Sequence, residues 1–401
     1  MYTRFYYLIF IFIFAGCTHT VSIKNEKRGK LVATHRLVQE GEKVFLLDYE
    51  TAPKPPFMQM IYSTTGGRIL TFLNPHKNSI YFYDYDREIQ IGETVYEKEG
   101  PNGILRPTGY YVKNMDSIYV YDMQKTELAL TDSAGKVKQR ISLRGGRGKD
   151  WSLYVPHYFL NSVIPFIQIQ DQLLLTGFSP ISLASNMIDK FRVSACIDTK
   201  TSEVEFMYTY PEELFGFDSN WEGGMALLVY PEVSPTGEII HSYAVSHDLY
   251  IAPWNSNTYK SVYAGSNTAS TIHAIDWADL KTTPHEVIFE HHAREDMYTA
   301  IRHDPYRKVY YRILLQGIPN ATSSTVKEKK PVAVVIMDEE FNYLGETVIG
   351  TWEKWIWTNS FVTSEGLMME YFDPDLDSDL DSDEQYLVFK AFKVEEIPLI
   401  K

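Results

Sequence analysis

One phrase recurs along this chain: a strand rich in Tyr, Ile and Val ends in Asp or Asn, and a polar turn leads into a second strand. The copies at Asn78–Asp84 and Asp116–Asp122 match almost letter for letter and start 38 residues apart. Looser copies occupy Phe191–Asp198, His247–Asn255 and Val332–Asp338. An Asp side chain can accept hydrogen bonds from backbone N–H groups two residues on, so it can start a turn between antiparallel strands.

The phrase predicts an all-β fold. Polar and apolar residues alternate within each copy, which gives each strand one buried face. The spacing leaves no room for crossover helices, so the strands are expected to be antiparallel. Repeated four-stranded units favour a six-bladed β-propeller, with a seven-bladed propeller or a large β-sandwich as the alternatives. The expected blades are 65–97, 103–145, 155–212, 224–265, 285–350 and 355–396.

A propeller ring must also close. The strand Glu42–Tyr49 has no blade of its own, and we expect it to pair beside Gln385–Phe392 in the last blade. Residues 35–401 would then form a single propeller domain closed by its N-terminal strand. Without that strand, the last blade would expose a sheet edge.

The composition agrees with a β fold and excludes one class of partner. Aromatic residues make up 14% of the chain, with 29 Tyr and 21 Phe, and such residues favour strands. The formal net charge is −14, whereas a general nucleic-acid binder carries a basic face. We therefore expect no nucleic-acid partner, and we expect a monomer.

The N-terminus has the pattern of a secretory signal peptide over residues 1–16. Arg4 is followed by eleven apolar residues, Phe5–Ala15, a run too short to span a bilayer as a helix. The sequence Phe14-Ala15-Gly16-Cys17 resembles a bacterial lipobox, which implies that Cys17 is acylated, for example with palmitate. Residues 17–34 would then be the lipidated Cys and a polar tether. The expected location is the cell envelope, with the lipid in the outer membrane and the body on its periplasmic or surface face.

These features together resemble the Bacteroidetes envelope lipoproteins with a six-bladed, TolB-like β-propeller, a group of unknown function. The turn Lys98–Gly103 is similar to a Gly-Pro turn that those proteins carry between blades. The resemblance covers residues 17–401. It implies a lipid-anchored propeller and supplies no catalytic residues.

Two glycine-containing segments are candidate loops. Lys98–Gly103 contains Pro101 between Gly100 and Gly103 and predicts an inter-blade turn, with part of a ligand mouth as the alternative. Arg144–Asp150 is rich in Gly and basic residues, but it lacks the spacing of a phosphate-binding P-loop. A flexible blade connection is expected there, with an anion site as the alternative.

The acidic segment Asp373–Glu384 has carboxylates at most ligand positions of a calcium loop. Ser378 stands where such a loop needs Gly for its sharp turn, and no helices are expected on either side. We predict a solvated hairpin tip that does not hold Ca²⁺ tightly, so no metal site and no cofactor are expected. Calcium binding by this loop is the alternative.

Three further groups of residues are expected to be structural. Cys196 lies in an apolar strand and is expected in the core. His285, His291, His292 and His303 lack the spacing of a zinc motif and are expected on the surface or in turns. The tryptophans at 352, 355 and 357 are expected to pack a blade edge, with stacking on a sugar or peptide as the alternative.

The sequence supports two functional hypotheses. The first is a non-enzymatic binding or scaffold module, held at the membrane by its lipid, for a protein, peptide or glycan partner. The alternative is a propeller enzyme, glycan-active or a metal-dependent lactonase-like hydrolase, with its site in the central funnel. No catalytic residue is identified, because no nucleophile elbow occurs and 52 acidic residues make any chosen pair uninformative.

Overall fold

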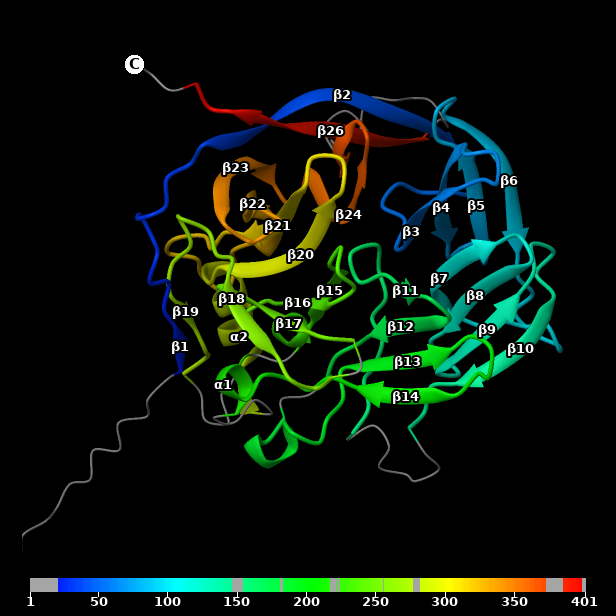
Figure 1. The fold of residues 1–401 in the computed structure, drawn as a ribbon, viewed down its shortest axis with the longest axis horizontal. Coiled ribbons are helices and arrows are strands. Elements are labelled where there is room, and N and C mark those ends of the chain that lie inside the picture. Colours follow the sequence, from blue (N-terminus) through cyan, green and yellow to red (C-terminus); the bar gives the residue numbers. More distant parts are fainter. Residues whose placement is uncertain are drawn as a thin grey trace, which may run out of the picture.

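The computed structural model describes residues 21–145, 154–180, 183–216, 221, 224–254, 256–276, 282–372 and 385–398. Within these residues, six four-stranded antiparallel sheets are arranged around a central axis (Figure 1). The chain is therefore a six-bladed β-propeller, as predicted, and neither a seven-bladed ring nor a sandwich. The observed sheets fall inside or close to the predicted blade divisions.

The first three blades use consecutive strands. Blade 1 contains β3 (Met58–Tyr62), β4 (Arg68–Asn74), β5 (Ser79–Asp84) and β6 (Ile89–Val95). Blade 2 contains β7 (Pro107–Asn114), β8 (Ser117–Asp122), β9 (Glu127–Thr131) and β10 (Val137–Ser142). Blade 3 contains β11 (Ile167–Ile169), β12 (Gln172–Thr176), β13 (Ser194–Asp198) and β14 (Val204–Met207).

The last three blades complete the ring. Blade 4 contains β15 (Val229–Val233), β16 (Ile239–Tyr243), β17 (Asp248–Ala252) and β18 (Lys260–Tyr263). Blade 5 contains β20 (Met297–Asp304), β21 (Val309–Leu315), β22 (Pro331–Asp338) and β23 (Tyr343–Thr351). Blade 6 contains β24 (Trp355–Thr363), β25 (Gly366–Tyr371), β26 (Gln385–Glu396) and, out of sequence order, β2 (His35–Leu47).

Strand β2 closes the ring. It runs antiparallel to β26, with Val44 opposite Val388 and Phe45 opposite Leu387. The two ribbons lie side by side across the top of Figure 1, although they come from opposite ends of the chain. The predicted pairing of the N-terminal strand with the last blade is confirmed. Strand β2 covers the outer edge of blade 6, which would otherwise be exposed. The ring is therefore closed by the hydrogen bonds between β2 and β26 alone.

The recurring Asp does start turns, as predicted. Asp84 accepts hydrogen bonds from the backbone of Asp86 and Arg87, and Asp198 accepts them from Lys200 and Thr201. The two nearly identical copies, however, do not occupy equivalent places: β5 is the third strand of its blade, whereas β8 is the second. The phrase therefore encodes a strand and its turn, not a position in the blade.

The segment 21–34, which we call the N-terminal strap, is packed on the body. Its short strand β1 (Ser22–Ile23) pairs with β19 (Ile272–His273), and the side chain of Asn25 donates to the carbonyls of Ser266 and Ala269. The prediction of a polar tether over residues 17–34 is therefore wrong for residues 21–34. Hydrogen bonds to blade 4 hold this part of the segment, which runs along the left edge of Figure 1.

Helices are few in the described part of the chain. The four-residue α1 (Glu212–Phe215) lies between blades 3 and 4, and α2 (His285–Arg294) lies between blades 4 and 5. A buried lysine, Lys330, donates from Nζ to the carbonyl oxygens of His292 and Glu295 at the end of α2. None of the helices seen there has the length and apolar character needed to cross a membrane.

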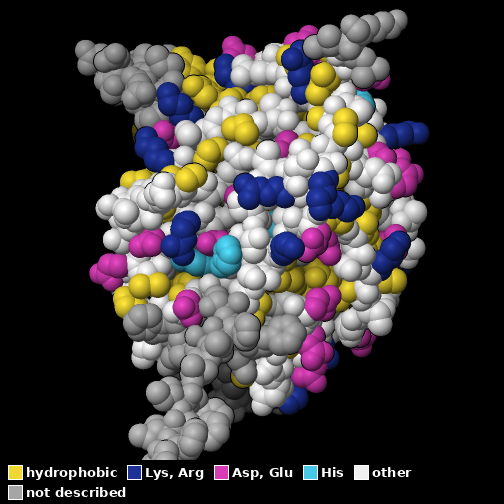
Figure 2. Space-filling model, turned by 90° about the vertical axis from the view of Figure 1, so that its left-hand side faces the viewer, with side chains coloured by type: hydrophobic (Ala, Val, Ile, Leu, Met, Phe, Trp, Pro, Cys, Tyr) yellow, Lys and Arg dark blue, Asp and Glu magenta, His cyan; other side chains and the backbone are white. Residues whose placement is uncertain are grey.

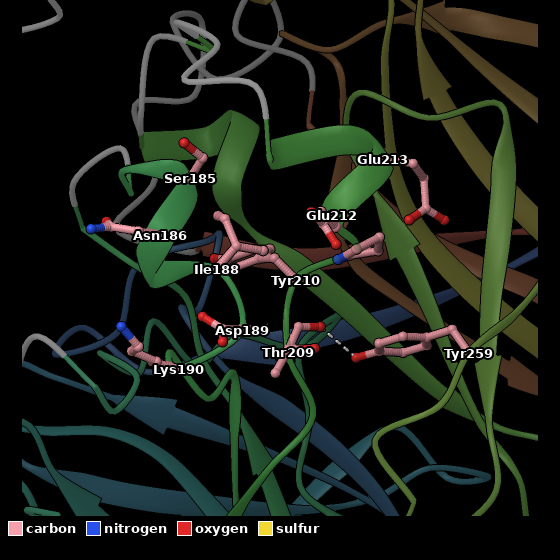
Figure 3. Close-up of a pocket in the computed structure, with 11 residues that line it drawn as sticks. Ser185, Asn186, Ile188, Asp189, Lys190, Thr209, Tyr210, Glu212, Glu213 and Tyr259 are labelled. Carbon is pink, nitrogen blue, oxygen red and sulfur yellow. Dashed lines mark hydrogen bonds between the residues drawn. The ribbon is translucent and has the colours of Figure 1, made fainter.

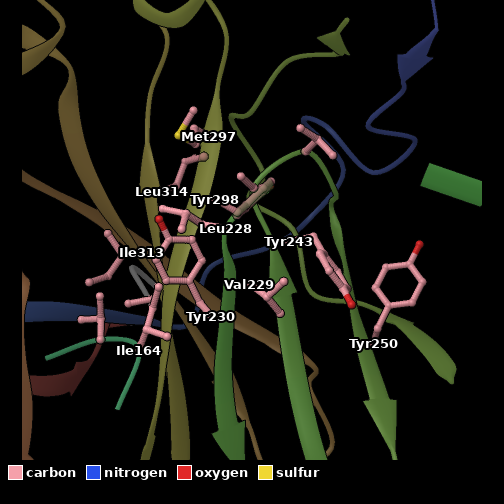
Figure 4. Close-up of a cluster of buried hydrophobic side chains, with 14 of the residues drawn as sticks. Ile164, Leu228, Val229, Tyr230, Tyr243, Tyr250, Met297, Tyr298, Ile313 and Leu314 are labelled. Carbon is pink, nitrogen blue, oxygen red and sulfur yellow. The ribbon is translucent and has the colours of Figure 1, made fainter. Parts of the chain in front are cut away.

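The core lies between the blades and is rich in tyrosine. Figure 4 shows Tyr230 of β15 beside Ile164 and Ile313, three side chains that come from different parts of the ring. A buried arginine joins blades 4 and 5: Arg312 of β21 donates to Ser242 Oγ and to carbonyls of the 243–248 turn, and its guanidinium lies 4.0 Å from the Tyr298 ring centroid. Backbone carbonyls therefore accept most of the hydrogen bonds that this buried cation donates.

The axial mouth, a candidate binding site

The first strand of each blade faces the ring axis, and one loop of the chain fills its centre. Strands β15, β20 and β24 contact one another in turn, as neighbouring inner strands do. The loop between blades 2 and 3, described over residues 154–166 and called the axial loop here, reaches several of these strands. A Cβ placed on Gly109 of β7 would lie 2.7 Å from Leu160 of this loop, so only glycine permits the close approach.

A buried hydrogen-bond network fixes the axial loop to blades 1 and 6. Ser162 Oγ donates to Asn359 Oδ1 (2.8 Å) and accepts from the backbone N–H of Met58 (2.9 Å). The Asn359 amide donates to the carbonyl of Pro55 and to Glu370 Oε2, at 2.9 and 2.6 Å. We call Ser162, Asn359 and Glu370 the axial network. Every polar side-chain atom of Asn359 is satisfied, as expected for a buried amide.

Burial dominates the chemistry of Glu370. Its carboxylate accepts from Asn359 and from the backbone N–H of Lys54, and both hydrogen bonds favour the charged form. Removal from water acts in the opposite direction and is the larger effect, so the pKa of Glu370 rises to about 7. Glu370 is 1% exposed and belongs to the support of the axis.

A cavity of about 290 Å³ opens beside this network, and we call it the axial mouth. Its lining residues come from the inner strands β3, β15, β20 and β24, from β4, and from the axial loop. One part of the lining is apolar and contains the side chains of Met58, Met60, Leu70, Phe361 and Val362. The cavity is small for a ligand site, and a volume near 300 Å³ is the lower end of the usual range.

An arginine–glutamate pair supplies the charged part of the lining. Arg302 Nη1 lies 3.9 Å from Glu232 Oε2, and Arg302 Nη2 donates to the carbonyl of Ser162. Glu232 also accepts backbone N–H groups from Val233 and His303. Burial raises the pKa of Glu232, and the positive charge of Arg302 opposes that rise. The two opposite charges make this part of the mouth electrically neutral overall.

Two buried polar atoms of the lining have no hydrogen-bond partner among the described residues: Arg302 Nε and Ser360 Oγ. Arg302 is 9% exposed and Ser360 is 1% exposed. An unsatisfied buried polar atom costs about 1–3 kcal/mol, so folded proteins rarely keep one without a reason. Both residues line the mouth, but neither of these two atoms is exposed to it.

The rim of the mouth is held by one contact between blades and one contact within blade 5. The hydroxyl groups of Tyr62 on β3 and Tyr306, in the turn after β20, lie 3.1 Å apart. His303 Nε2 lies 3.1 Å from Glu339 Oε1, which follows blade 5's third strand. These contacts position the rim and leave the apolar wall for a ligand.

A second cavity, the side hollow, lies at the edge of the ring (Figure 3). Its volume is about 610 Å³, and its lining comes from the stretch 185–190, from Thr209–Glu213 and from Tyr259. Figure 3 places Asp189 and Lys190 on one side of the hollow and Glu212 and Glu213 on the other, and Tyr259 donates to the carbonyl of Thr209. The side hollow is polar, is built largely from connecting segments, and lacks the buried unsatisfied side chains of the mouth.

The structure places the predicted site residues in several different regions. Cys17 and Asp373–Glu384 lie outside the described residues, as does most of Arg144–Asp150. The turn Lys98–Gly103 connects blades 1 and 2 as predicted, and its carbonyls accept hydrogen bonds from Lys125 and Arg140. Cys196 is buried as predicted, and burial raises the pKa of its thiol to about 12.

The histidine prediction is partly wrong. His291 and His292 are buried on α2, at 6% and 9% exposure, because that helix packs against the body; His285 begins the helix. His303 lies on β20 and lines the axial mouth. The sequence analysis expected no helix here, so it could not show that His291 and His292 are buried.

Trp355 and Trp357 lie on β24 of blade 6, Trp352 follows β23 of blade 5, and none of the three lines either cavity. Trp355 contacts the rings of Tyr371 and Phe392, and Trp352 and Trp357 lie 5.9 Å apart between ring centroids. The sequence analysis predicted a packing role for these three tryptophans. Within the described ranges, no group of three or more His, Cys, Asp or Glu side chains is placed to hold a metal ion.

The sequence reasoning missed the residues of the mouth altogether. Ser162, Arg302, Asn359 and Ser360 carry no local motif, and they meet only because the ring brings blades 5 and 6 against the axial loop. A charged residue directly after buried apolar residues of an inner strand, such as Arg302 after Ala300 and Ile301, was the available signal.

Comparisons with known proteins agree with this fold. A crystal structure of a DUF4221 family member from Bacteroides vulgatus matches this fold with a TM-score of 0.75. The two sequences are 20% identical, and the match covers 91% of this chain and 99% of that chain. A protein from Bacteroides fragilis that is thought to be exported gives 0.52 and 9%, over 90% and 96%. These identities show a shared fold alone, and no protein of curated function matches the sequence. Residues 34–348 match a family model described as "Domain of unknown function (DUF4221)", and the chain therefore belongs to the DUF4221 family.

Proposed function

We propose that this protein is a lipid-anchored binding module of the cell envelope whose ligand site is the axial mouth. The observation that carries the binding proposal is the cavity of about 290 Å³ among the inner strands, whose apolar wall lies beside the Arg302–Glu232 pair. The alternative of a metal-dependent hydrolase has no comparable supporting observation among the described residues.

The envelope part of the proposal is supported by the N-terminus. The signal-peptide pattern ends at the lipobox-like Cys17, and the structural relative from Bacteroides fragilis is thought to be exported. Only residues 18–20 separate Cys17 from the N-terminal strap, a reach of roughly 10 Å in an extended chain. An acyl chain on Cys17 would therefore hold the strap side of the propeller close to the membrane. The resemblance to TolB-like propellers stays a prediction.

The strap side also has a suitable charge. Lys24, Lys27, Arg28 and Lys30 are all exposed, in a protein whose net charge is −14. Figure 2 faces this side and shows Lys and Arg side chains across its middle, with acidic side chains among them. Basic groups near a bilayer are attracted to anionic lipids. A strap side held against the membrane would leave the other faces of the ring free for a partner.

The anchor is tested by Cys17→Ala. We expect the wild-type chain to incorporate labelled fatty acid and to sediment with membranes, and the variant to do neither. Membrane retention of the variant, without label, would contradict the anchor and leave the binding proposal untouched.

The binding role is tested by capture from solubilised envelopes with three forms of the chain. Met60→Trp places a bulky side chain in the mouth, and Met115→Trp adds the same side chain at a site 47% exposed in blade 2. We expect the wild type and Met115→Trp to retain the same partner, and Met60→Trp to lose it. Capture unaffected by Met60→Trp, or no capture above a bare-resin control, would contradict the proposal.

A further inference from the structure

We infer that the N-terminal strap is a lipid-binding surface, which places Lys27, Arg28 and Lys30 on the anionic headgroups of a bilayer. The inference rests on the proposed membrane location and deepens it by naming the surface and the class of lipid. It follows from the fixed backbone of the strap, from the charge of its basic side chains, from an exposed apolar residue beside them, and from the short distance to Cys17.

Hydrogen bonds to the body fix the backbone of the strap. The Asn25 side chain donates to two carbonyls of the segment 266–269, and the N–H of Gly29 donates to the carbonyl of Asn267 at 2.9 Å. Residues 26–30 form turns between these contacts. A bilayer therefore meets basic side chains whose backbone is already ordered, and binding does not have to order a free tether.

Three basic side chains of these turns make no ion pair with the described residues. Lys27 Nζ lies 4.4 Å from the centroid of a tyrosine ring, and Lys30 Nζ donates to the carbonyl of Glu26 at 2.8 Å, so both ammonium groups contact uncharged partners. The Glu26 carboxylate pairs instead with Lys24. In the described part of the chain, no carboxylate lies at ion-pair distance from Lys27, Arg28 or Lys30. Their charges are therefore open to anionic headgroups, and each basic group near a bilayer strengthens binding.

An apolar side chain extends the same surface. Val32 follows Lys30 by two positions and is 78% exposed. Segments that lie in the interface of a bilayer combine basic groups, which contact the headgroups, with apolar groups, which enter the boundary of the acyl chains. Val32 provides the apolar contact here.

The position of Cys17 favours a bilayer over a soluble polyanion as the partner. Only residues 18–20 lie between Cys17 and the strap, a reach of roughly 10 Å in an extended chain. An acyl chain on Cys17 would keep the strap beside the headgroups. A single acyl chain binds a membrane only marginally, and a basic surface next to it supplies a second contact.

The test uses vesicle flotation of the chain that starts at Thr18, which keeps every described residue and lacks Cys17. The vesicles are phosphatidylcholine alone, or phosphatidylcholine with about one third phosphatidylglycerol. At about 50 mM salt, the chain should bind the anionic vesicles and not the neutral ones. Binding should be lost at about 0.5 M salt, where charges are screened over about 4 Å.

The triple variant Lys27→Gln, Arg28→Gln and Lys30→Gln should bind the anionic vesicles at least tenfold more weakly, because three charges at the surface are lost. Its melting temperature should stay unchanged, since all three side chains are exposed. Binding that is insensitive to this change would overturn the inference.

A matched control removes the same charge far from the strap. Lys113, Lys136 and Lys138 are exposed in blade 2, on the opposite side of the ring in Figure 1. Changing all three to Gln should alter the affinity by less than twofold. Equal weakening by the two triple variants would mean that only net charge matters, and would contradict a specific surface.

A fluorophore reports which residue meets the bilayer. Cys196, the one cysteine of the chain that starts at Thr18, is 4% exposed, so an added cysteine can be labelled selectively. An environment-sensitive dye on Val32→Cys should shift to the blue with anionic vesicles. The same dye on Met115→Cys, at a site 47% exposed in blade 2, should not. A blue shift confined to Met115→Cys would contradict the assignment of the strap.

The outcomes separate this inference from the proposed anchor. No binding by the Thr18 chain, or equal binding to neutral and anionic vesicles, would overturn the inference and leave the acylation of Cys17 in place. Absence of fatty-acid label on the wild type would contradict the anchor and leave the vesicle binding of the strap in place. Because salt screens the strap, the fractionation of Cys17→Ala is measured after a wash at about 0.5 M salt.

Discussion

The axial network and the axial mouth lie next to each other at the centre of the ring, and they differ in how their buried polar atoms are satisfied. In the network, every polar side-chain atom of Ser162, Asn359 and Glu370 has a hydrogen-bond partner. In the mouth, Arg302 Nε and Ser360 Oγ have none. Both regions include residues of blades 1 and 6 and of the axial loop. The difference indicates that the network contributes to the stability of the ring, whereas these two side-chain atoms of the mouth do not.

The largest expected effect comes from Asn359→Ala. The change leaves Ser162 Oγ, the Pro55 carbonyl and the Glu370 carboxylate each without one partner, and unsatisfied buried groups cost about 1–3 kcal/mol each. We expect the free energy of unfolding to fall by about 4 kcal/mol in urea denaturation. The exposed Asn186→Ala should change it by less than about 0.5 kcal/mol. A mild effect of Asn359→Ala would remove the distinction between the two regions.

The next effect is a pH dependence carried by Glu370. Its pKa is about 7 in the folded protein and 4.5 in its ordinary environment, so the folded state binds a proton that the unfolded chain lacks between these values. This contribution is fully present below pH 4.5 and is lost as the pH rises through 7. Between pH 5 and pH 8, the wild type should lose roughly 2–3 kcal/mol relative to Glu370→Gln, which cannot ionise.

Denaturant unfolding of both chains at pH 5, 6, 7 and 8 measures this difference directly. Other carboxyl groups titrate in both chains and cancel. A difference between the two chains that does not change with pH would show that Glu370 is ionised throughout this range.

A smaller loss is expected for Ser162→Ala. The variant removes the acceptor for the backbone N–H of Met58 and the donor to Asn359 Oδ1, and we expect a loss of about 1–2 kcal/mol. The carbonyl of Ser162 remains for Arg302. Thermal unfolding of Ser162→Ala should therefore show lower stability with an intact ring, and an unchanged melting temperature would contradict the role given to the network.

The smallest stability effect belongs to the mouth. Ser360→Ala removes a hydroxyl that has no partner, so the free energy of unfolding should change by less than about 0.5 kcal/mol or rise slightly. The comparison with Ser162→Ala is matched, because both serines are buried in the same region. A loss as large as that of Ser162→Ala would mean that Ser360 is a structural residue and that the two regions do not differ.

Local features of the fold could be predicted from the sequence, whereas the meeting of distant segments could not. Asp84 and Asp198, which end two of these strands, accept hydrogen bonds from residues within three positions. The strand before Tyr49 had no blade of its own, and a closed ring offered it one place, beside the last blade. The axial network joins residues as far apart as Ser162 and Asn359, a separation of 197 positions. No short pattern records such a contact.

Sequence likeness was also a poor guide to position. The strands ending at Asp84 and Asp122 are nearly identical, yet they are the third and second strands of their blades. The strap offers a second example: its lysines and polar residues predicted a free tether, but Asn25 provides two hydrogen bonds to blade 4 that fix the segment. In both cases the deciding contacts are tertiary.

The most direct test of the account is a titration of methyl-labelled methionine, followed by NMR. The chain has 12 methionines; Met58 and Met60 line the mouth, and Met207, Met337 and Met369 are buried elsewhere in the blades. With the partner that the wild type captures from envelopes, we predict saturable shifts of the Met58 and Met60 methyl signals and little change at the other three. Shifts confined to methionines outside the mouth, or none at a saturating amount of that partner, would contradict the assignment of the axial mouth as the binding site.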